Sequence, residues 1–591
     1  MNLHPDYLLN RVEEPEDIKT MSMDQLEQLA EEMRTLILER VSTIGGHLGP
    51  DLGIVELAIA YHYVFNSPTD KVIWDVSHNS YPHKMLTGRK LGFMDPDHYQ
   101  DISGFTAPDE SDHDFFKIGH TSTSVALAVG EAEARDLKQD PKHRNIVAVI
   151  GDGSLSGGLA FEAFNNASKV KGNLIIVVND NEMSIDDNQG GLYQGLAELR
   201  ATEGKSPNNL FTFMGLDYRC IEDGNDLPTM IQMFKDVQDI DHPIVLHIHT
   251  LKGKGYQPAI DEKFKYHWRK AFDPATGEDR QAPAQESYNQ AVVKELLAEI
   301  DEGHEIAAIN AAIPGAFGLK DFQAAQPDRY FDVGIAEQAS ITTAVGMAEA
   351  GIRPVVFENS TFLQRGLDQL IHDVALNSSP IVMVVVNGSI SSQSATHQGT
   401  FDISYISSLP NIEYLAPTSV EEMVSMLRWA IHQQDVPVVI RQPAHELLHR
   451  PATTNDYDEV KYEIAHQGQD VALMAVGGFW KLGEQVQAQL KEKLNIDATL
   501  INPISVTNLD YETLHHLPEQ HDVVVTIEDG NLSGGFGETI ARYFGPTNVK
   551  VLSFGAPREF ADAVPLDVLY NQYHLTPQQI VDDIQRVVHT F

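Results

Sequence analysis

Cysteine is nearly absent from this 591-residue sequence, in which Cys220 is the only one. A single cysteine excludes an intramolecular disulfide and favours a reducing compartment, so we expect a cytoplasmic protein. Basic residues are also scarce: 42 Lys and Arg stand against 85 Asp and Glu, for a net charge of −43. Because such a chain repels phosphate backbones and anionic lipids, the sequence predicts neither a nucleic-acid partner nor a membrane partner.

Long apolar runs are missing as well. No segment approaches the roughly 18 apolar residues that a membrane span requires. The first twenty residues carry acids where a secretory signal needs bases and an apolar stretch, which again favours the cytoplasm. Short β-branched runs instead alternate with helical patterns along the whole length, and this alternation predicts an α/β protein. The length predicts several domains, and segments rich in Pro, Gly and acids suggest boundaries that give 1–285, 286–457 and 458–591.

One βαβ unit, residues 146–185, carries the strongest chemical signal. Two buried runs, 146–150 and 174–178, each end in polar residues, and a helical pattern lies between them. Asp152 follows the first run between two glycines, and Asn179, Asp180 and Asn181 follow the second, 27 to 29 residues later. Ligands bind at the carboxyl ends of parallel strands, where carboxylate and amide oxygens suit Mg²⁺. The alternative is a pair of ordinary turns that end two strands.

Several loops carry histidines before or after predicted elements. His47 lies in a glycine-rich loop, His78 and His83 follow a strand, and His120 precedes a helix that begins with Ser and Thr. Such loops converge in a parallel sheet, and imidazoles transfer protons near neutral pH, although a single loop histidine is more often structural. Two further segments, 186–209 and 265–287, have the polar or Pro- and Gly-rich composition of a loop and a linker.

Ten ordered motifs resemble one known family from end to end. They are GGHLGPDLGIVEL, IWDVSHNSYPHK, GFTAPDESDHD, IGHTSTS, GDG followed by NDNEMSI, KGKGYQPA, DVGIAEQ, STFLQRGLDQLIHDVAL, THQGTFD and EDGNLSGGFGE. The chain thereby resembles the 1-deoxy-D-xylulose-5-phosphate synthases, a branch of the transketolase-type thiamine diphosphate enzymes. The resemblance implies three doubly wound α/β domains of transketolase type: a diphosphate-binding, a pyrimidine-binding and a C-terminal domain. It also implies thiamine diphosphate and Mg²⁺ as cofactors, small-molecule substrates and a homodimer.

The resemblance further implies a role for each matching residue. The metal ligands would be Asp152, Asn181 and the main-chain carbonyl of Met183. Other groups would contact the cofactor, namely His78, Gly119, His120, Thr121, Ser122, Gly153, Ser154, Asn181, Lys252, Phe362 and Arg365. The catalytic groups would be Glu337, His47, His78, His267 and His397. Glu337 matches the carboxylic acid beside the pyrimidine N1′; its alternative is a first-turn acid that complements a helix dipole.

The departures from the family pattern concern the acceptor substrate. Family residues that hold D-glyceraldehyde 3-phosphate are replaced here, by Pro50, Asn359, Val386, Gln393 and Ala444. Arg441 is kept, and Arg441, His445 or Lys84 are candidates to restore a phosphate site. We therefore predict a carboligase that decarboxylates pyruvate or a related 2-oxo acid and transfers the two-carbon unit to an aldehyde, with an acceptor less dependent on phosphate. The alternatives are a transketolase-type ketol transfer and a non-catalytic protein that binds the cofactor.

Overall fold

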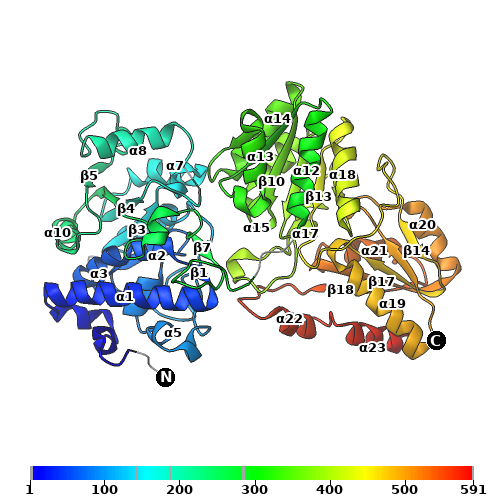
Figure 1. The fold of residues 1–591 in the computed structure, drawn as a ribbon, viewed down its shortest axis with the longest axis horizontal. Helices are drawn as coiled ribbons and strands as arrows, with labels where there is room; N and C mark the ends of the chain where they lie inside the picture. Colours follow the sequence, from blue (N-terminus) through cyan, green and yellow to red (C-terminus); the bar gives the residue numbers. More distant parts are fainter. Residues whose placement is uncertain (1–3, 140–143, 187, 282–285, 589–591) are drawn as a thin grey trace. The chain divides into compact units, whose positions relative to one another are not determined.

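The computed structural model describes residues 4–139, 144–186, 188–281 and 286–588, which form two compact units (Figure 1). The first unit comprises residues 1–283 with 334–336, and the second comprises 284–333 with 337–591. The first unit holds one parallel sheet and a two-stranded antiparallel sheet, and the second holds one parallel and one mostly parallel sheet. The α/β class is thus confirmed, while the domain boundaries near 285 and 457 stay predictions.

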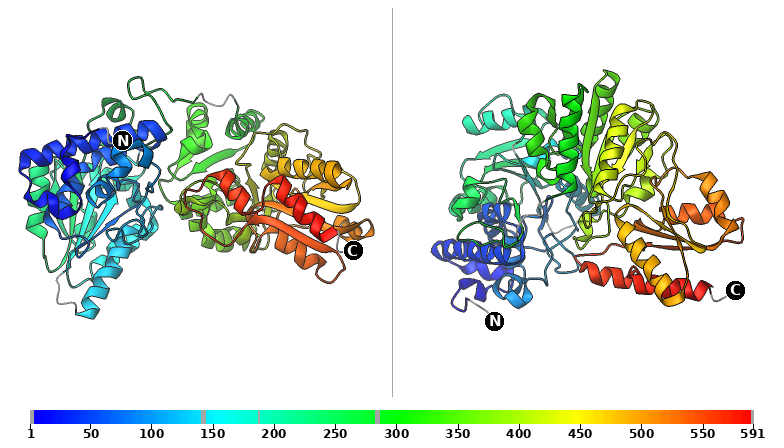
Figure 2. Two further views of the ribbon diagram at one scale, coloured as in Figure 1. Left: turned by 90° about the horizontal axis from the view of Figure 1, so that it is seen from below. Right: turned by 45° about the vertical axis from the view of Figure 1, so that its right-hand side comes forward.

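The five parallel strands of the first unit lie in the order β2-β3-β4-β6-β5. Their bounds are β2 (Lys71–Trp74), β3 (Ile146–Gly151), β4 (Leu174–Asp180), β5 (Asp217–Ile221) and β6 (Pro243–His249). Helices cover both faces (Figure 2). One face packs on α1 (Met23–Ile44), α3 (Val55–Val64) and α10 (Leu227–Val237), and the other on α6 (Ser124–Lys138) and α7 (Gly158–Ala167).

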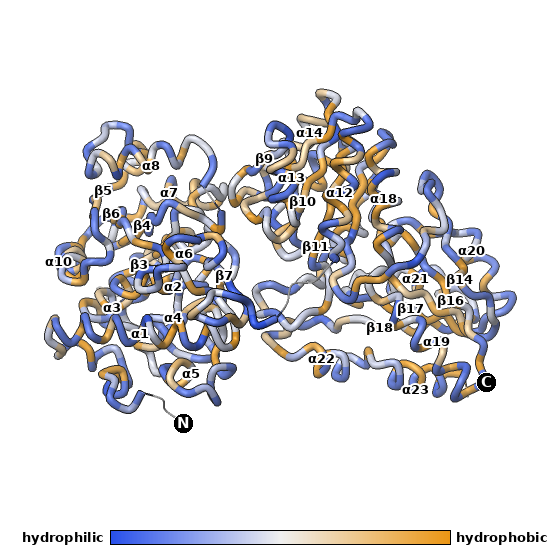
Figure 3. The backbone as a smooth tube through the Cα atoms, viewed as in Figure 1, coloured by the Kyte–Doolittle hydropathy of each residue, from blue (hydrophilic) through white to orange (hydrophobic). Residues whose placement is uncertain are grey.

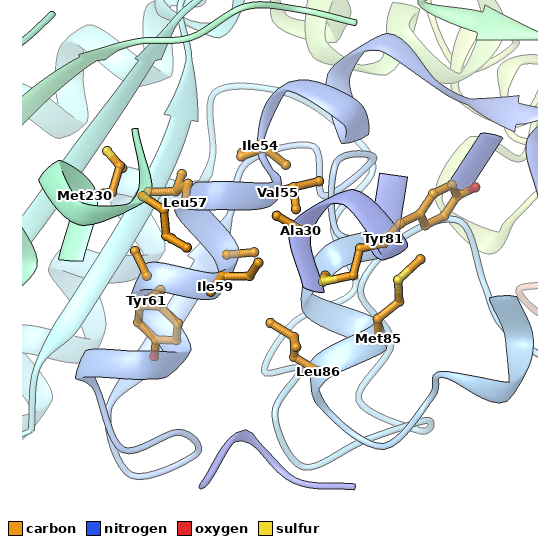
Figure 4. Packing of buried hydrophobic residues seen from close by; sticks show 14 of the residues in the cluster. Ala30, Ile54, Val55, Leu57, Ile59, Tyr61, Tyr81, Met85, Leu86 and Met230 are labelled. Atoms are coloured by element: carbon orange, nitrogen blue, oxygen red, sulfur yellow. The ribbon is translucent and has the colours of Figure 1, made fainter. Parts of the chain in front are cut away.

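The alternation of side chains along β3 explains why both faces are apolar. Val147 and Val149 belong to the core on the α1, α3 and α10 side, which Figure 4 shows around Ile59 and Tyr61. Ala148 and Ile150 belong to the core on the α6 and α7 side. Successive strand residues point to opposite faces, so a continuous apolar run is what a sheet covered on both faces requires.

The second unit contains six parallel strands in the order β12-β13-β11-β10-β8-β9. Their bounds are β8 (Ile306–Asn310), β9 (Tyr330–Asp332), β10 (Arg353–Asn359), β11 (Val382–Val386), β12 (Glu413–Leu415) and β13 (Val438–Arg441). On one face lie α12 (Tyr288–Asp301) and α18 (Val420–His432), and on the other lies α14 (Glu337–Glu349). Figure 3 shows apolar stretches along these strands and helices.

The last sheet has the order β14-β16-β15-β17-β18, with β14 antiparallel to its neighbour. Its strands are β14 (Glu463–His466), β15 (Asp470–Ala475), β16 (Thr499–Asn502), β17 (His521–Asn531) and β18 (Lys550–Ala556). The helices that pack on it are α19 (Trp480–Leu494), α21 (Phe536–Phe544) and α23 (Pro577–Val588). One apolar cluster joins Val356 of the middle sheet to Met474 of this one, so the two sheets of this unit share a core.

Two sequence interpretations are wrong. Residues 186–209, expected to be a loop, contain α8 (Gly191–Ala201), which buries Leu196 and Leu199. The expected linker at 265–287 begins with β7 (Trp268–Arg269), which pairs antiparallel with β1 (Gly46–His47), and Phe272 is fully buried. A two-residue strand and a short amphipathic helix leave little periodicity, so neither element was apparent in these polar segments. Within the described ranges, none of the helices is long and apolar enough to cross a membrane.

Candidate active site

The structure brings the two polar clusters of the βαβ unit together. Strands β3 and β4 pair in parallel, with Gly151 opposite Asn179, and the Asp152 amide donates a hydrogen bond to the Asn179 carbonyl (3.0 Å). Asp152 is only 1% exposed. Its Oδ2 accepts a hydrogen bond from Asn188 Nδ2 (2.8 Å). The Asp152 carboxylate and the polar residues at the carboxyl end of β4 therefore lie at one edge of the sheet, as the sequence predicted.

The three polar residues at the carboxyl end of β4, namely Asn179, Asp180 and Asn181, differ in their hydrogen bonds. Asp180 accepts from Arg200 Nη1 (2.5 Å) and contacts His247 Nε2 (2.8 Å), and the Asn179 amide oxygen accepts from Thr250 (2.6 Å). By contrast, the amide oxygen of Asn181 is buried and has no hydrogen-bond partner among the described residues. Asn181 is thus the one of the three whose oxygen is left for a ligand.

These groups fit a divalent cation. Burial, and next the nearby charge of Asp180, raise the pKa of Asp152 to about 7. A cation offsets the cost of a buried carboxylate and satisfies an unpaired amide oxygen, and both are the oxygen ligands that Mg²⁺ prefers. Lys252, 2% exposed, donates from Nζ to the Ser184 carbonyl (2.7 Å) and so fixes the segment that follows Asn181 and contains Met183. Burial lowers the pKa of Lys252 to about 8.

A loop that contains four predicted cofactor contacts is held by a residue that the sequence analysis missed. The Asp75 carboxylate, just beyond β2, accepts hydrogen bonds from the Ser122 and Ser124 amides (2.8 and 2.9 Å). Ser122 Oγ donates to the Ser154 carbonyl (2.7 Å), which joins this loop to the turn after β3. In that loop Gly119 and Ser122 are buried, and His120 and Thr121 are half-buried. An acid directly after a buried strand was the available signal.

Three of the predicted catalytic histidines form one cluster in the first unit. The ring centroid of His78 lies 4.8 Å from that of His47 and 5.2 Å from that of His267, and the other pair is 5.7 Å apart. The β1–β7 pairing makes this possible, because it brings the strand after His267 alongside His47. Burial, and next the charge of Lys252, hold the pKa of His267 well below its usual range, so His267 is neutral at pH 7.

The other histidine of that segment, His83, is structural. It is fully buried and contacts His62 (2.9 Å) and Asp114 (2.9 Å). The Asp114 carboxylate in turn accepts two hydrogen bonds from Arg89 (2.6 and 3.0 Å). His78 lies in the turn after β2, whereas His83 lies in the short helix α4 (Tyr81–Leu86) that follows, and the sequence did not show that only the first joins the cluster.

The remaining predicted residues lie in the second unit. Glu337 begins α14 and is 4% exposed, and Arg365 Nη1 lies 3.4 Å from both of its carboxylate oxygens. The ring of Phe362 meets that of His397 edge to face at 5.6 Å. Burial lowers the pKa of His397 to about 4. Phe362 and Arg365 follow β10 and His397 follows β11, neighbouring strands whose carboxyl ends share one edge.

A second buried carboxyl, Glu358, accompanies Glu337 and was not predicted. It lies in β10 and is fully buried. The Ser340 hydroxyl lies 2.9 Å from Glu358 Oε1 and 2.7 Å from the Glu337 carbonyl oxygen. Glu358 Oε2 has no hydrogen-bond partner in the part of the chain that the structure describes. Burial, and next the charge of Glu337, raise the pKa of Glu358 well above its usual value.

Glu358→Gln is expected to stabilise the protein at alkaline pH. Below about pH 4 both states carry the proton and the substitution changes little. As pH rises, the unfolded state loses this proton before the folded state does, so wild-type stability falls with pH. The glutamine does not titrate, and its advantage should grow to about 1 to 3 kcal/mol. Thermal midpoints at pH 5 and pH 8.5 test this, with the exposed Glu349→Gln as control; an equal loss of stability at both pH values would contradict it.

The replaced acceptor positions offer no arginine, and the remaining cations are engaged. The fully buried Arg441 pairs with Asp402 (2.8 Å) and with Asp529. His445 contacts Tyr570 (3.2 Å), and burial lowers its pKa. Lys84, in the first unit, is buried and pairs with Glu110 (2.5 Å). None of the three candidates that the sequence suggested for a phosphate contact is therefore free of a protein partner.

The substituted residues themselves take ordinary structural places. Val386 ends β11 in the core, and Pro50 is buried at the start of a short helix. Asn359 caps the next helix by accepting from the Thr361 amide (3.2 Å), Ala444 is half-buried, and Gln393 is exposed.

Comparison with known proteins places the chain in a family. Three family models match in succession: 1-deoxy-D-xylulose-5-phosphate synthase over residues 9–207, the pyrimidine-binding domain of transketolase over 284–448, and the C-terminal domain of transketolase over 460–580. Together with the three parallel or mostly parallel sheets, they define a transketolase-type enzyme. A synthase of this name from Clostridium tetani is 37% identical over 98% of this chain and 99% of its own. One from Geobacter sulfurreducens is 39% identical over 94% of each chain.

The chain therefore belongs to the 1-deoxy-D-xylulose-5-phosphate synthase family. It is a thiamine diphosphate-dependent transferase, a carboligase of the class that the sequence predicted. Among solved structures, a transketolase from Pichia stipitis in complex with sedoheptulose 7-phosphate is 16% identical over 95% of this chain and 97% of that chain, with a TM-score of 0.44.

Proposed function

We propose that the chain decarboxylates pyruvate or a related 2-oxo acid and joins the two-carbon unit to an aldehyde, without an arginine-built site for an acceptor phosphate. The observation that carries the first part is the buried carboxylate of Asp152 at the same edge of the sheet as the unpaired amide oxygen of Asn181. The second part rests on Arg441, which two buried carboxylates neutralise. Asp152, Asn181 and Arg441 all match residues to which the family resemblance assigns a role.

The residues of the first unit would hold the cofactor and its metal. Asp152, Asn181 and the Met183 carbonyl would bind Mg²⁺. The diphosphate would be held by the loop and turn that Asp75 and Ser122 fix, with these contacts: Gly119, His120, Thr121, Ser122, Gly153, Ser154 and Lys252. Bound thiamine diphosphate would supply the carbanion chemistry that protein side chains lack.

The other predicted residues would transfer protons and orient the pyrimidine ring of the cofactor. Glu337 would hold a proton at its carboxyl for the pyrimidine N1′, with Arg365 beside it and Phe362 stacked on that ring. His397 and the cluster His47, His78 and His267 would exchange protons with substrate oxygens. Burial lowers the pKa of His267 and His397, which favours the neutral imidazole, a form that can donate one hydrogen bond and accept another.

A product screen tests the reaction. The full chain with Mg²⁺ and thiamine diphosphate is supplied with labelled pyruvate and a panel of phosphorylated and unphosphorylated aldehydes. Release of CO₂ with a labelled two-carbon product supports the proposal. Turnover only with ketose donors and no CO₂ would instead favour transketolase-type ketol transfer, and no turnover with any donor would favour a non-catalytic protein that binds the cofactor.

Asp152→Ala is expected to abolish cofactor binding. Asp152 would be a ligand of the metal that compensates the diphosphate charge, so without its carboxylate that charge would be left uncompensated. Calorimetric titration with thiamine diphosphate and Mg²⁺ should show at least a hundredfold weaker binding, by analogy with a charge-assisted interaction of about 3 kcal/mol. The exposed Asp241→Ala is the matched control. Wild-type affinity in Asp152→Ala would remove this residue from its assigned role.

We also propose a cytoplasmic homodimer, as the family resemblance implies. Light scattering on the purified chain tests whether it is a dimer, and a monomer at micromolar concentration would contradict the proposed homodimer.

A further inference from the structure

A second group of metal-binding side chains lies in the second unit, on other elements than the residues assigned to the cofactor. Glu299 is in the last turn of α12, His304 follows that helix, and His432 is the last residue of α18. One ligand atom from each lies within 4.8 Å of the other two. Glu299 Oε2 is 2.8 Å from His432 Nε2 and 3.4 Å from His304 Nε2, and the two rings stack at 4.6 Å.

These distances suit an ion with tetrahedral coordination. Ligand atoms about 2.0 to 2.1 Å from Zn²⁺ are about 3.3 Å from one another in that geometry. Glu299 Oε2 lies 2.8 and 3.4 Å from the two imidazole nitrogens, and all three ligand atoms lie within 4.8 Å of one another, so small side-chain shifts bring them to this spacing. Two imidazoles and one carboxylate are a set that Zn²⁺, Ni²⁺ and Cu²⁺ prefer over Mg²⁺. Glu299 is 2% exposed at its side chain, whereas His304 and His432 are 39% and 44% exposed, so an ion can enter and water can complete its coordination.

The surroundings orient the carboxylate and favour a cation. Arg428 Nε donates to Glu299 Oε1 (3.3 Å), which leaves Oε2 for the histidines, and outer contacts of this kind hold metal ligands in place. Glu295 pairs with the same arginine (2.6 Å) and offsets its charge. The C-terminal ends of two helices meet here, and their dipoles favour positive charge.

We propose that Glu299, His304 and His432 bind a late first-row divalent cation, with Zn²⁺ as the first candidate, and that the ion ties the C-terminal ends of α12 and α18 together. This site goes beyond the carboligase function and does not depend on it. The competing explanation is that both imidazoles simply hydrogen-bond to Glu299, in which case no metal is retained.

The experiment counts metal equivalents. Full-length protein saturated with Mg²⁺ and thiamine diphosphate is titrated with Zn²⁺ against a chromophoric chelator. Wild type should bind one equivalent more than His432→Gln or His304→Gln, or bind that equivalent at least a hundredfold more tightly. His515→Gln removes a histidine of the exposed pair at the end of another helix and should match wild type. Equal stoichiometry and affinity in wild type and both ligand variants would overturn the proposal.

A stability measurement gives an independent readout. Zn²⁺ should raise the thermal midpoint of wild type and of His515→Gln, because a ligand that binds only the folded state stabilises it. The same addition should leave the midpoints of His304→Gln and His432→Gln unchanged. Each variant has a control without metal, so a variant that fails to fold is identified directly. A rise of equal size in all four proteins would place the ion elsewhere.

Discussion

Glu337→Gln is expected to bind thiamine diphosphate normally and to lose turnover. Glutamine keeps the size and hydrogen-bonding shape of the side chain but cannot hold the proton that the proposed role requires. Loss of a positioned acid or base typically costs a factor of about 10² to 10⁴ in rate. We therefore expect kcat to fall to 1% of wild type or less at saturating cofactor, while calorimetry shows an unchanged cofactor affinity.

The control for this result is Glu349→Gln, at the exposed other end of the same helix α14. It changes the same charge without removing a buried group and should keep full activity. The variant is also distinguished from Asp152→Ala, which is expected to lose the cofactor itself. A Glu337→Gln enzyme that keeps more than a few per cent of wild-type kcat would return Glu337 to the simpler role of a first-turn acid on the helix dipole.

The βαβ unit was readable from the sequence because its signals are long and redundant. Two continuous β-branched runs are what buried parallel strands require, and polar residues at their ends lie at one edge by topology alone. Which of Asn179, Asp180 and Asn181 faces a ligand was not derivable in the same way. That choice depends on Arg200, His247 and Thr250, partners that come from distant segments.

The missed features depend on contacts of high sequence separation. The pairing of β1 with β7 is only two residues long, yet it brings His267 alongside His47, although the two histidines are 220 residues apart in the sequence. Asp75 is visible in the sequence as an acid directly after a buried strand, but its partners, the main-chain amides of Ser122 and Ser124, are not. Glu358 breaks a buried apolar strand, and a lone acid in such a run gives no indication of its neighbour Glu337.

The prediction about the acceptor substrate rests on two arginines of the family that are replaced here, by Val386 and Ala444, and on Arg441, which is already paired. A charge-assisted hydrogen bond contributes about 1.5 to 3 kcal/mol, so two missing contacts cost about 3 to 6 kcal/mol, or about 10² to 10⁴ in kcat/KM. Arg441 cannot make up this loss, because removing it from Asp402 and Asp529 would leave two buried carboxylates unpaired. We therefore expect D-glyceraldehyde 3-phosphate to be a poor acceptor here.

The test compares kcat/KM for D-glyceraldehyde 3-phosphate and for unphosphorylated glyceraldehyde, in wild type and in Ala444→Arg. Val386 is unsuitable for a restoring arginine, because its side chain is 2% exposed in the core between the middle sheet and α12 and α18, where an unpaired charge would unfold the protein. Ala444 is half-buried and can accept a long side chain. Ala444→Met adds length without charge, so a gain for the phosphorylated aldehyde in Ala444→Arg alone supports the proposal. A wild-type value near 10⁵ M⁻¹s⁻¹ with the phosphorylated aldehyde, inside the ordinary enzyme range of about 10⁴ to 10⁸, would show that another group binds the phosphate.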